Sequence, residues 1–264
     1  MNFDLRNLNN WLKANKISLN ASKTELIIFR HHNKKILYDL KLKLNGKRLV
    51  PSKFVKYLGL IIDPHLTWRF HTDILASKLS RSIGMLCKIR HYVNYITIRS
   101  IYYGIFSSLM VYGSQIWGQF QNKYVNRILK LQDKAVRLIN FASTYDSRNP
   151  LYLKTNILKF SDHIKLLNFM LVYDSLKNNL PSILNNNFTQ VNKIHNHSTR
   201  YALHNKVALP KSKTIIYGIK SIKFQSSTTW NFFTGKYQNK ELFNQSKHYC
   251  KKVITQHFLD NYKE

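Results

Sequence analysis

The sequence predicts an α+β protein. A helix and a small antiparallel β structure with a hairpin come first, a mainly helical region follows, and an irregular region ends the chain. Two observations support this order. Leucines alternate with lysines over residues 40–44, Asn45-Gly46 follows, and residues 47–50 resume a strand pattern, which is a strong signal of a β-hairpin. From about Phe70 onward, apolar residues recur at the three- and four-residue spacing of helices.

The expected elements before residue 66 are short. The first is a helix that ends near residue 15, and its apolar face consists of Leu5, Leu8, Trp11 and Leu12. Residues 24–29 are β-branched or apolar for the most part and predict a strand. Residues 55–63 predict another strand, largely buried, which Asp63-Pro64 ends because proline cannot continue a ladder.

Helices are expected over most of the remaining chain. The first carries an apolar stripe of Leu75, Leu79, Ile83 and Leu86. Others are predicted at residues 98–112, 123–140, 160–177 and 238–262. Residues 141–150 predict a loop, residues 178–198 an Asn-rich linker with Pro181, and residues 199–233 an irregular region with short strands.

The segment 100–122 carries no charged residue, so a membrane span is one interpretation of it. A span needs about 20 predominantly apolar residues, and serines, glycines and glutamines interrupt this run. The apolar positions recur at helical spacing, at Ile98, Ile101, Tyr102, Ile105 and Leu109. This pattern favours a helix that faces a protein core, and no membrane partner is expected.

The charge of the chain is strongly unbalanced. Lys and Arg number 42 against 12 Asp and Glu, which gives a formal net charge of +30. Nucleic acid is therefore the expected partner; an acidic membrane surface is the second choice on charge alone and is not predicted as a partner. A codon bias toward Lys and Asn would add lysines, but it would not explain why acidic residues are so few.

The cysteine content argues against a zinc site or a disulfide framework. Cys87 and Cys250 are the only cysteines, and no C-x-x-C motif occurs. The N-terminus lacks the apolar stretch of a signal peptide. Together these features predict an intracellular protein, with both cytoplasm and nucleus open.

The helix predicted at residues 123–140 carries a cationic stripe. Its members recur every three or four residues, so they share one helical face: Lys123, Arg127, Lys130, Lys134 and Arg137. Only Asp133 reduces this charge within the helix, whereas a solvated surface face usually mixes Glu with Lys. We expect the stripe to contact a nucleic-acid backbone, and an ordinary solvated face is the alternative. The first expected helix, which carries the apolar stripe from Leu75 to Leu86, adds Lys78, Arg81 and Lys88 on its opposite side.

Several motifs, in a fixed order, carry a family resemblance. They are Lys23-Thr24-Glu25 at a strand entry, Lys56-Tyr57-Leu58-Gly59, Leu66-Thr67-Trp68 with His71, Arg81-Ser82-Ile83-Gly84, Tyr112-Gly113 with Trp117, Leu131-Gln132-Asp133-Lys134-Ala135, and Trp230-Asn231. This order resembles the part of non-LTR (LINE-type) retrotransposon reverse transcriptases that follows the catalytic aspartates. The resemblance implies the end of a palm at residues 1–66, a helical thumb-like module at 67–145, and a C-terminal region at 146–264.

The resemblance also implies which activity to expect. In this family, carboxylates hold two Mg²⁺ ions for RNA-directed DNA synthesis, and an Asp-Asp pair precedes the opening helix. The chain contains no two adjacent acidic residues. We therefore expect no catalytic residue, no metal site, no cofactor and no polymerase activity from this chain alone. The family's fingers and upstream palm would be partners.

Four residues acquire expected roles from the resemblance alone. Lys23 falls where such polymerases place a lysine near the nucleotide phosphates, although a plain surface lysine is the stronger interpretation. Lys56, Tyr57 and Gly59 fall at the primer grip, a hairpin that holds the 3′ end of the primer. An ordinary buried strand with a packing glycine is an equal alternative.

The expected function is thus a fragment that binds an RNA–DNA or RNA template–primer duplex without extending it. Two alternatives stay open: a non-enzymatic nucleic-acid-binding protein derived from a retroelement, and a maturase-like RNA-binding protein. Trp68 and His71 are expected to form a structural corner, and neither is assigned to catalysis or metal binding.

Overall fold

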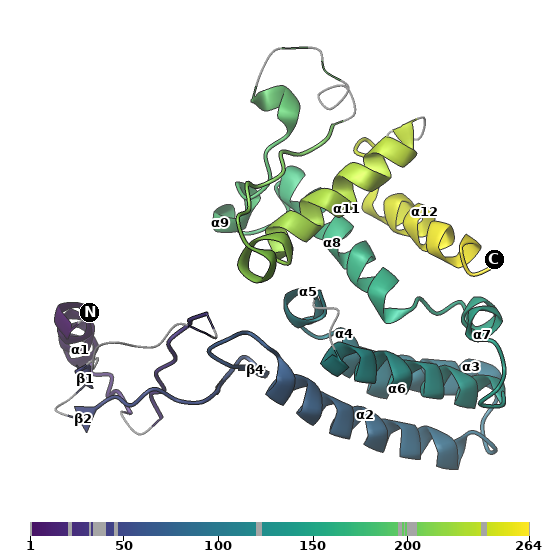
Figure 1. The fold of residues 1–264 in the computed structure, drawn as a ribbon, viewed down its shortest axis with the longest axis horizontal. Coiled ribbons are helices and arrows are strands. Elements are labelled where there is room, and N and C mark those ends of the chain that lie inside the picture. Colours follow the sequence, from purple (N-terminus) through teal and green to yellow (C-terminus); the bar gives the residue numbers. More distant parts are fainter. Residues whose placement is uncertain are drawn as a thin grey trace. The chain divides into compact units, whose positions relative to one another are not determined.

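The structure is a computed structural model that describes residues 2–20, 23–31, 33, 41–44, 47–119, 123–194, 197, 199, 205–238 and 242–263. Over these residues the protein is mostly helical, with 59% helix and two small antiparallel two-stranded sheets near the N-terminus (Figure 1). The predicted α+β class is therefore confirmed. The chain divides into two compact units, Met1–Ile74 and Leu75–Glu264, which are called the N-terminal and the C-terminal unit.

The N-terminal unit begins with α1 (Asn2–Ala14) and a hairpin of β1 (Lys43–Leu44) and β2 (Lys47–Arg48). The two strands pair antiparallel with Leu44 opposite Lys47, which confirms the predicted hairpin. Its Asn45-Gly46 turn and Leu40 lie outside the described residues. The small core of this unit contains Leu42, Leu44 and Leu49, with Leu5, Leu19 and Leu26 packed against it. Much of the apolar face of α1, including Trp11, remains exposed.

The single buried strand predicted at residues 55–63 is instead a second hairpin. Strand β3 (Val55–Tyr57) pairs antiparallel with β4 (Leu60–Ile62), with Tyr57 opposite Leu60. Leu58 and Gly59 make the turn with φ values of 46° and 81°, and two positive φ angles are the condition for a two-residue type I′ turn. The prediction of burial is also wrong at the tip, where Tyr57 is 63% and Leu58 72% exposed.

The strand predicted at residues 24–29 is reduced to one bridge. Leu26 pairs with Pro51 only, and its carbonyl accepts a hydrogen bond from the Ser52 amide at 2.7 Å. Pro51 has no N–H to donate, so the ladder cannot continue from it. The strand prediction was wrong: among the described residues this segment has only the Leu26–Pro51 bridge, which Pro51 cannot extend.

The predicted structural corner around Trp68 is centred on a buried carboxylate. Asp63 is 4% exposed, and its oxygens accept hydrogen bonds from the Thr67 hydroxyl and from the backbone amides of His65, Thr67 and Trp68. These bonds fix the turn, in which Trp68 has a positive φ of 62°. The His71 Nδ1 accepts from the Ile61 amide at 3.5 Å. These contacts agree with a scaffolding role for Trp68 and His71.

Helix α2 (Arg69–Ile89) leads into the C-terminal unit, whose elements are helical. In order they are α3 (Tyr95–Ile101), the π-helix η1 (Tyr102–Ser107), α4 (Ser108–Val111), α5 (Ser114–Trp117), α6 (Lys123–Asn140), α7 (Arg148–Thr155), α8 (Phe160–Leu176), α9 (Ser182–Asn185), the 3₁₀ turn η2 (Val191–Lys193), the π-helix η3 (Ile215–Ile219), α11 (Ile222–Lys236) and α12 (Lys247–Asp260). The predicted apolar stripe of α2 is confirmed, because Leu75, Leu79, Ile83 and Leu86 are all buried.

The segment from α3 to α4 is one continuous helix with a π-helical middle. Its buried apolar residues are spaced by four: Ile98, Tyr102, Phe106 and Met110. A π-helix makes i→i+5 hydrogen bonds and so has more residues per turn than an α-helix. The buried face therefore shifts along the helix, and Leu109, predicted to face the core, is 37% exposed. No helix among the described residues has the length and apolar character needed to cross a membrane.

A buried glutamine ties α6 to its neighbours. Gln132 is 1% exposed, and its amide nitrogen donates to the Tyr102 hydroxyl at 3.2 Å and to the Leu158 carbonyl at 3.0 Å. Its amide oxygen accepts from the Phe160 amide at 2.8 Å. Burial raises the pKa of Tyr102 above its ordinary value, and the hydrogen bond from Gln132 offsets part of that rise. The polar network fixes α6 against η1 and the start of α8.

The far end of the chain contains a helix that the sequence reading missed. Residues 199–233 were predicted to be irregular, but α11 occupies Ile222–Lys236, and the hydroxyl of its N-cap residue, Ser221, accepts a hydrogen bond from the Phe224 amide. Its Trp230 is fully buried and stacks on Phe169 of α8 at 4.6 Å. The serines and threonines of α11 have low intrinsic helix propensity, and tertiary packing outweighs it. The last predicted helix is present but shorter than predicted: α12 covers Lys247–Asp260, whereas the prediction was 238–262.

Candidate nucleic-acid interface

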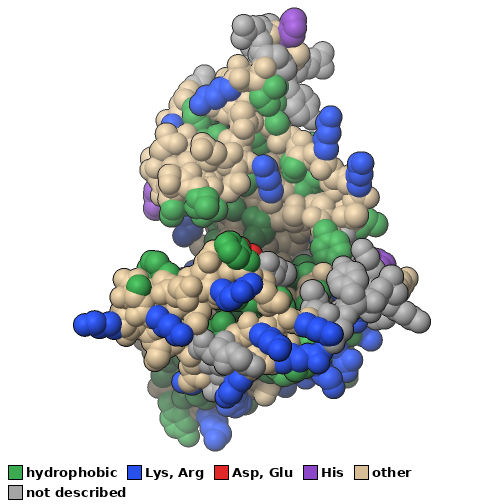
Figure 2. Space-filling view, turned by 90° about the vertical axis from the view of Figure 1, so that its left-hand side faces the viewer, with side chains coloured by type: hydrophobic (Ala, Val, Ile, Leu, Met, Phe, Trp, Pro, Cys, Tyr) green, Lys and Arg blue, Asp and Glu red, His purple; other side chains and the backbone are tan. Residues whose placement is uncertain are grey.

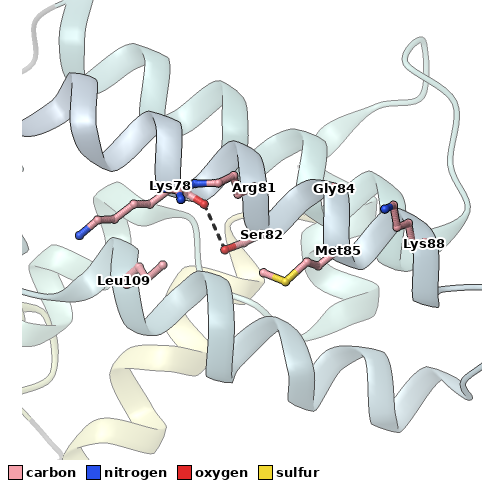
Figure 3. Close-up of a pocket in the computed structure, with 7 residues that line it drawn as sticks. All are labelled: Lys78, Arg81, Ser82, Gly84, Met85, Lys88 and Leu109. Atoms are coloured by element: carbon pink, nitrogen blue, oxygen red, sulfur yellow. Dashed lines mark hydrogen bonds between the residues drawn. The ribbon is translucent and has the colours of Figure 1, made fainter.

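Helix α2 and helix α4 border a groove of about 610 Å³, here called the α2 groove. Its lining residues are Lys78, Arg81, Ser82, Gly84, Met85, Lys88 and Leu109 (Figure 3). All three cations that the sequence predicted on this helix are among them. Met85 extends toward the facing helix, which also carries Leu109. The groove thus combines apolar side chains with three positive charges on one helix.

Ser82 joins the two walls of the α2 groove. It is 2% exposed, and its hydroxyl is 2.9 Å from the Ile105 carbonyl of η1 and 3.3 Å from the Lys78 carbonyl of its own helix. A π-helical segment has an altered hydrogen-bond pattern, which leaves carbonyl groups available to other donors. The Ser82 contact therefore fixes the separation of the walls.

The space beside Gly84, in the middle of α2, is not filled by other atoms of the chain. A Cβ atom built at this position has no heavy atom within 4 Å. Glycine in a helix interior is destabilising by about 0.5–1 kcal/mol relative to alanine. The packing of this chain does not require glycine here, so the gap is available to a ligand that comes close to the backbone.

The α6 stripe forms a second cationic surface in the same unit. Lys123, Arg127, Lys130 and Lys134 are exposed and lie opposite the buried face of α6, which is made of Val125, Ile128, Gln132, Ala135, Val136 and Ile139. Arg137, the fifth predicted member, is half-buried.

Arg137 uses its guanidinium within the chain. Its Nε donates to the Ser143 carbonyl and its Nη2 to the Asp146 carbonyl, both at 3.1 Å. These bonds hold the loop after α6. Arg137 therefore has a positioning role toward that loop, which the spacing of the stripe did not predict.

The single acid of α6, Asp133, is paired with side chains from outside the helix. Asp133 accepts from Arg148 Nη1 at 3.0 Å and from the Tyr152 hydroxyl at 2.9 Å. The hydrogen bond to Asp133 raises the pKa of Arg148. Because Arg148 already compensates this carboxylate, the charge of the neighbouring lysines stays largely unbalanced.

The remaining predicted site residues lie in the N-terminal unit. Lys56, Tyr57 and Gly59 come together in the β3–β4 hairpin, with both side chains exposed. Lys23 is exposed in a turn in which its amide donates to the Asn20 carbonyl at 3.1 Å. Figure 2 shows a face on which Lys and Arg side chains are numerous and acidic side chains nearly absent among the coloured residues.

The structure adds residues to the groove that sequence reasoning did not select. Ser82, Gly84, Met85 and Leu109 line it beside the predicted cations. A glycine inside a strong helical pattern was the available signal for Gly84. Among the described residues, no three His, Cys, Asp or Glu side chains gather closely enough to hold a metal ion.

Comparison with known proteins finds distant relatives among transposon polymerases. The chain is 26% identical over 160 residues to "Probable RNA-directed DNA polymerase from transposon X-element" of Drosophila melanogaster, covering 58% of the chain and 17% of the relative. It is 26% identical over 159 residues to "RNA-directed DNA polymerase from mobile element jockey" of Drosophila funebris, covering 59% and 17%.

The similarity to "Probable RNA-directed DNA polymerase from transposon BS" of Drosophila melanogaster is 26% over 126 residues, or 47% of the chain and 14% of the relative. The chain thus spans about one sixth of the length of these relatives. No protein-family model matches it, and no solved structure matches it at a significant level. What the comparisons establish is a distant similarity to non-LTR retrotransposon reverse transcriptases.

Proposed function

We propose that this chain binds a template–primer duplex of RNA and DNA, in the manner of the reverse transcriptase segment that follows the catalytic aspartates, and does not extend the primer on its own. The similarity to transposon polymerases supports the nucleic-acid partner. The observation that carries the proposal is the α2 groove, in which three cations and an open glycine lie along one helix.

The dimensions of the α2 groove suit a sugar–phosphate backbone. With a rise of about 1.5 Å per residue, Lys78 and Lys88 are about 15 Å apart along the helix. That distance corresponds to roughly four base steps of about 3.4 Å. Lysine and arginine neutralise phosphates and release counterions, while Met85 and Leu109 offer apolar contact to sugars. The groove thus matches a backbone that carries one charge per step.

The α6 stripe supplies further charge in the same unit. From Lys123 to Lys134 it extends about 16 Å along the helix. Because the stripe lies opposite the buried face of α6, its ammonium and guanidinium groups are accessible to phosphates. We assign Lys123, Arg127, Lys130 and Lys134 to general, sequence-independent attraction of the backbone.

The β3–β4 hairpin is proposed as the primer-contacting element of the N-terminal unit. Its turn residues have positive φ angles, and its tip presents Tyr57 and Leu58 to solvent. An exposed aromatic ring next to Lys56 suits contact with a sugar and its phosphate. Lys23 is retained in the proposal only as a surface cation.

The expected inactivity rests on the sequence. Two-metal phosphoryl transfer requires carboxylates that hold both ions about 4 Å apart. No two acidic residues are adjacent anywhere in the 264 residues. We therefore propose that polymerisation needs the upstream part that the family possesses, and that this chain contributes duplex binding.

The experiment measures the dissociation constant for a blunt 16-base-pair RNA–DNA duplex at several salt concentrations. The logarithm of the association constant falls as the logarithm of salt concentration rises. Changing Lys78, Arg81 and Lys88 to Gln should make this negative slope shallower by up to about 3, since each phosphate contact contributes about 0.9. A parallel variant neutralises Arg127, Lys130 and Lys134 to Gln.

The matched control changes three exposed lysines far along the chain, Lys211, Lys213 and Lys223, to Gln. This control removes the same charge as the groove variant. Because its lysines do not line the α2 groove, it should alter the slope much less. The proposal is wrong if the control weakens binding as much as the groove variant, or if salt has no effect on affinity. Primer extension with Mg²⁺ or Mn²⁺ should stay at background, and templated extension would contradict the proposed inactivity.

A further inference from the structure

Two loops of the C-terminal unit bring exposed aromatic rings and cations together at one end. The loop after α2 carries Arg90, His91 and Tyr92, and the loop after α6 carries Phe141 and Tyr145. The centroids of the Phe141 and His91 rings are 5.4 Å apart, and the Arg90 guanidinium carbon is 5.1 Å from the centroid of the Phe141 ring. Figure 1 shows the ends of α2 and α6 on the same side of this unit. These five residues are called the aromatic tip.

The rings of the aromatic tip contribute little to the core of the protein. Tyr145 is 96%, Tyr92 88% and Phe141 57% exposed. Single exposed apolar residues are common on protein surfaces. Three rings on two touching loops form a group, however, and clustered exposed aromatics mark a binding surface.

The loop that carries Phe141 and Tyr145 is held in place by the chain itself. Arg137 donates to the Ser143 and Asp146 carbonyls, and the Asp146 carboxylate accepts from the Ser143 amide at 2.7 Å. The Ala142 amide donates to the Arg137 carbonyl at 3.0 Å. Phe141 has a φ of 54°, a left-handed conformation that costs a non-glycine residue energy. The rings are therefore presented on an ordered loop.

We propose that the aromatic tip binds unpaired bases of single-stranded nucleic acid, next to the duplex in the α2 groove. The proposal rests on the proposed duplex binding. Bases stack on aromatic side chains and on arginine, and a nearby cation meets the phosphate. Tyr92, Phe141 and Tyr145 supply the rings at the tip, and Arg90 supplies the cation. Lys88, which lines the groove, precedes Arg90 by two residues, so one strand can continue from the groove to the tip.

Charge decides between a nucleic acid and a protein as the ligand. The only acidic side chain in the two loops is Asp146, and its carboxylate is used by the Ser143 amide. Arg90 stands beside the rings, and its Nε donates to His91 Nε2 at 3.1 Å. Arg90 beside exposed rings, in a chain of net charge +30, suits a nucleic acid, which combines negative phosphates with flat bases.

The test compares two probes on the full chain: the blunt 16-base-pair RNA–DNA duplex and the same duplex with a six-nucleotide single-stranded extension. The wild-type chain should bind the extended probe more tightly. In a Tyr92→Ser, Tyr145→Ser variant the advantage of the extension should fall about fivefold or more for each ring that a base had used. Affinity for the blunt duplex should not change. Because both tyrosines are almost fully exposed, the variant is expected to fold.

A control variant, Tyr112→Ser with Tyr249→Ser, removes two partly exposed tyrosines elsewhere in the same unit and should keep the advantage. A 2-aminopurine base in the extension should lose fluorescence on binding to the wild type, and less on binding to the tip variant. The inference is overturned if the extension adds no affinity to the wild type. It is also overturned if the tip variant keeps the full advantage, which is the result expected if the tip binds a protein partner instead. Duplex binding that still depends on Lys78, Arg81 and Lys88 would then leave the proposed function intact, whereas loss of all salt-dependent binding would end both.

Discussion

Replacing Gly84 with alanine should make the protein more stable and its nucleic-acid binding weaker. The stability gain follows from helix propensity, because alanine in a helix interior is about 0.5–1 kcal/mol more favourable than glycine. No atom lies within 4 Å of the new Cβ, so no packing cost offsets the gain. For a unit of this size, the midpoint of thermal unfolding should rise by about 1–4 °C.

The added methyl group should act in the opposite direction on binding. It enters the α2 groove where we propose that a sugar–phosphate backbone meets the helix. Overfilling a close contact costs about 1–3 kcal/mol, and 1 kcal/mol corresponds to roughly fivefold in affinity. Circular dichroism measures the unfolding midpoint, and fluorescence anisotropy with the blunt duplex measures the dissociation constant.

Gly104→Ala is the matched control. Gly104 is also a helical glycine with open space at its Cβ, and it does not line the α2 groove. Its substitution should leave affinity unchanged. If Gly84→Ala binds the duplex as tightly as the wild type, the backbone of a ligand does not approach α2 at this point, and the proposed occupancy of the groove is wrong.

Two further predictions concern stability. Gln132→Leu should lower the free energy of unfolding by about 2–4 kcal/mol, measured by urea denaturation, because it leaves the Phe160 amide and the Leu158 carbonyl buried without their partner; a loss below 0.5 kcal/mol would contradict this. Burial, then the nearby Lys236 charge, lowers the pKa of His257, so the unfolded state holds that proton more tightly. Thermal stability should therefore decline as the pH falls below the ordinary histidine value of about 6.5, and a His257→Phe variant should decline less.

The sequence predicted an element correctly where a single hydrophobic period runs through the whole element. The apolar stripe of α2 and the β1–β2 hairpin follow directly from spacing. The reasoning was wrong where the period itself changes. The π-helical segment η1 shifts the buried face from Leu109 to Met110, and nothing in local composition signals this. Likewise, the turn at Leu58 places a bulky residue at positive φ, which propensity disfavours.

The candidate interface divides in the same way. Local sequence was enough to find Lys78, Arg81 and Lys88, because i+3 and i+10 positions share a face of one helix. It could not find Leu109, because the second wall of the groove depends on how α4 packs. It also placed Arg137 with the stripe by spacing alone, whereas its guanidinium is directed to loop carbonyls by tertiary structure.

The residues that carry the resemblance are, in this structure, mostly scaffold. Gln132 bridges three elements, and Trp117 stacks on Phe160 at 5.1 Å. Asn231 holds the Val207 backbone, with its oxygen accepting from the amide and its nitrogen donating to the carbonyl. These motif residues stabilise the packing of the helices, so similarity at their positions indicates a shared framework. The exposed cations of the α2 groove and the α6 stripe lie largely outside those buried positions. Function must therefore be argued from surface charge, which is why salt dependence and charge-matched variants are the decisive measurements.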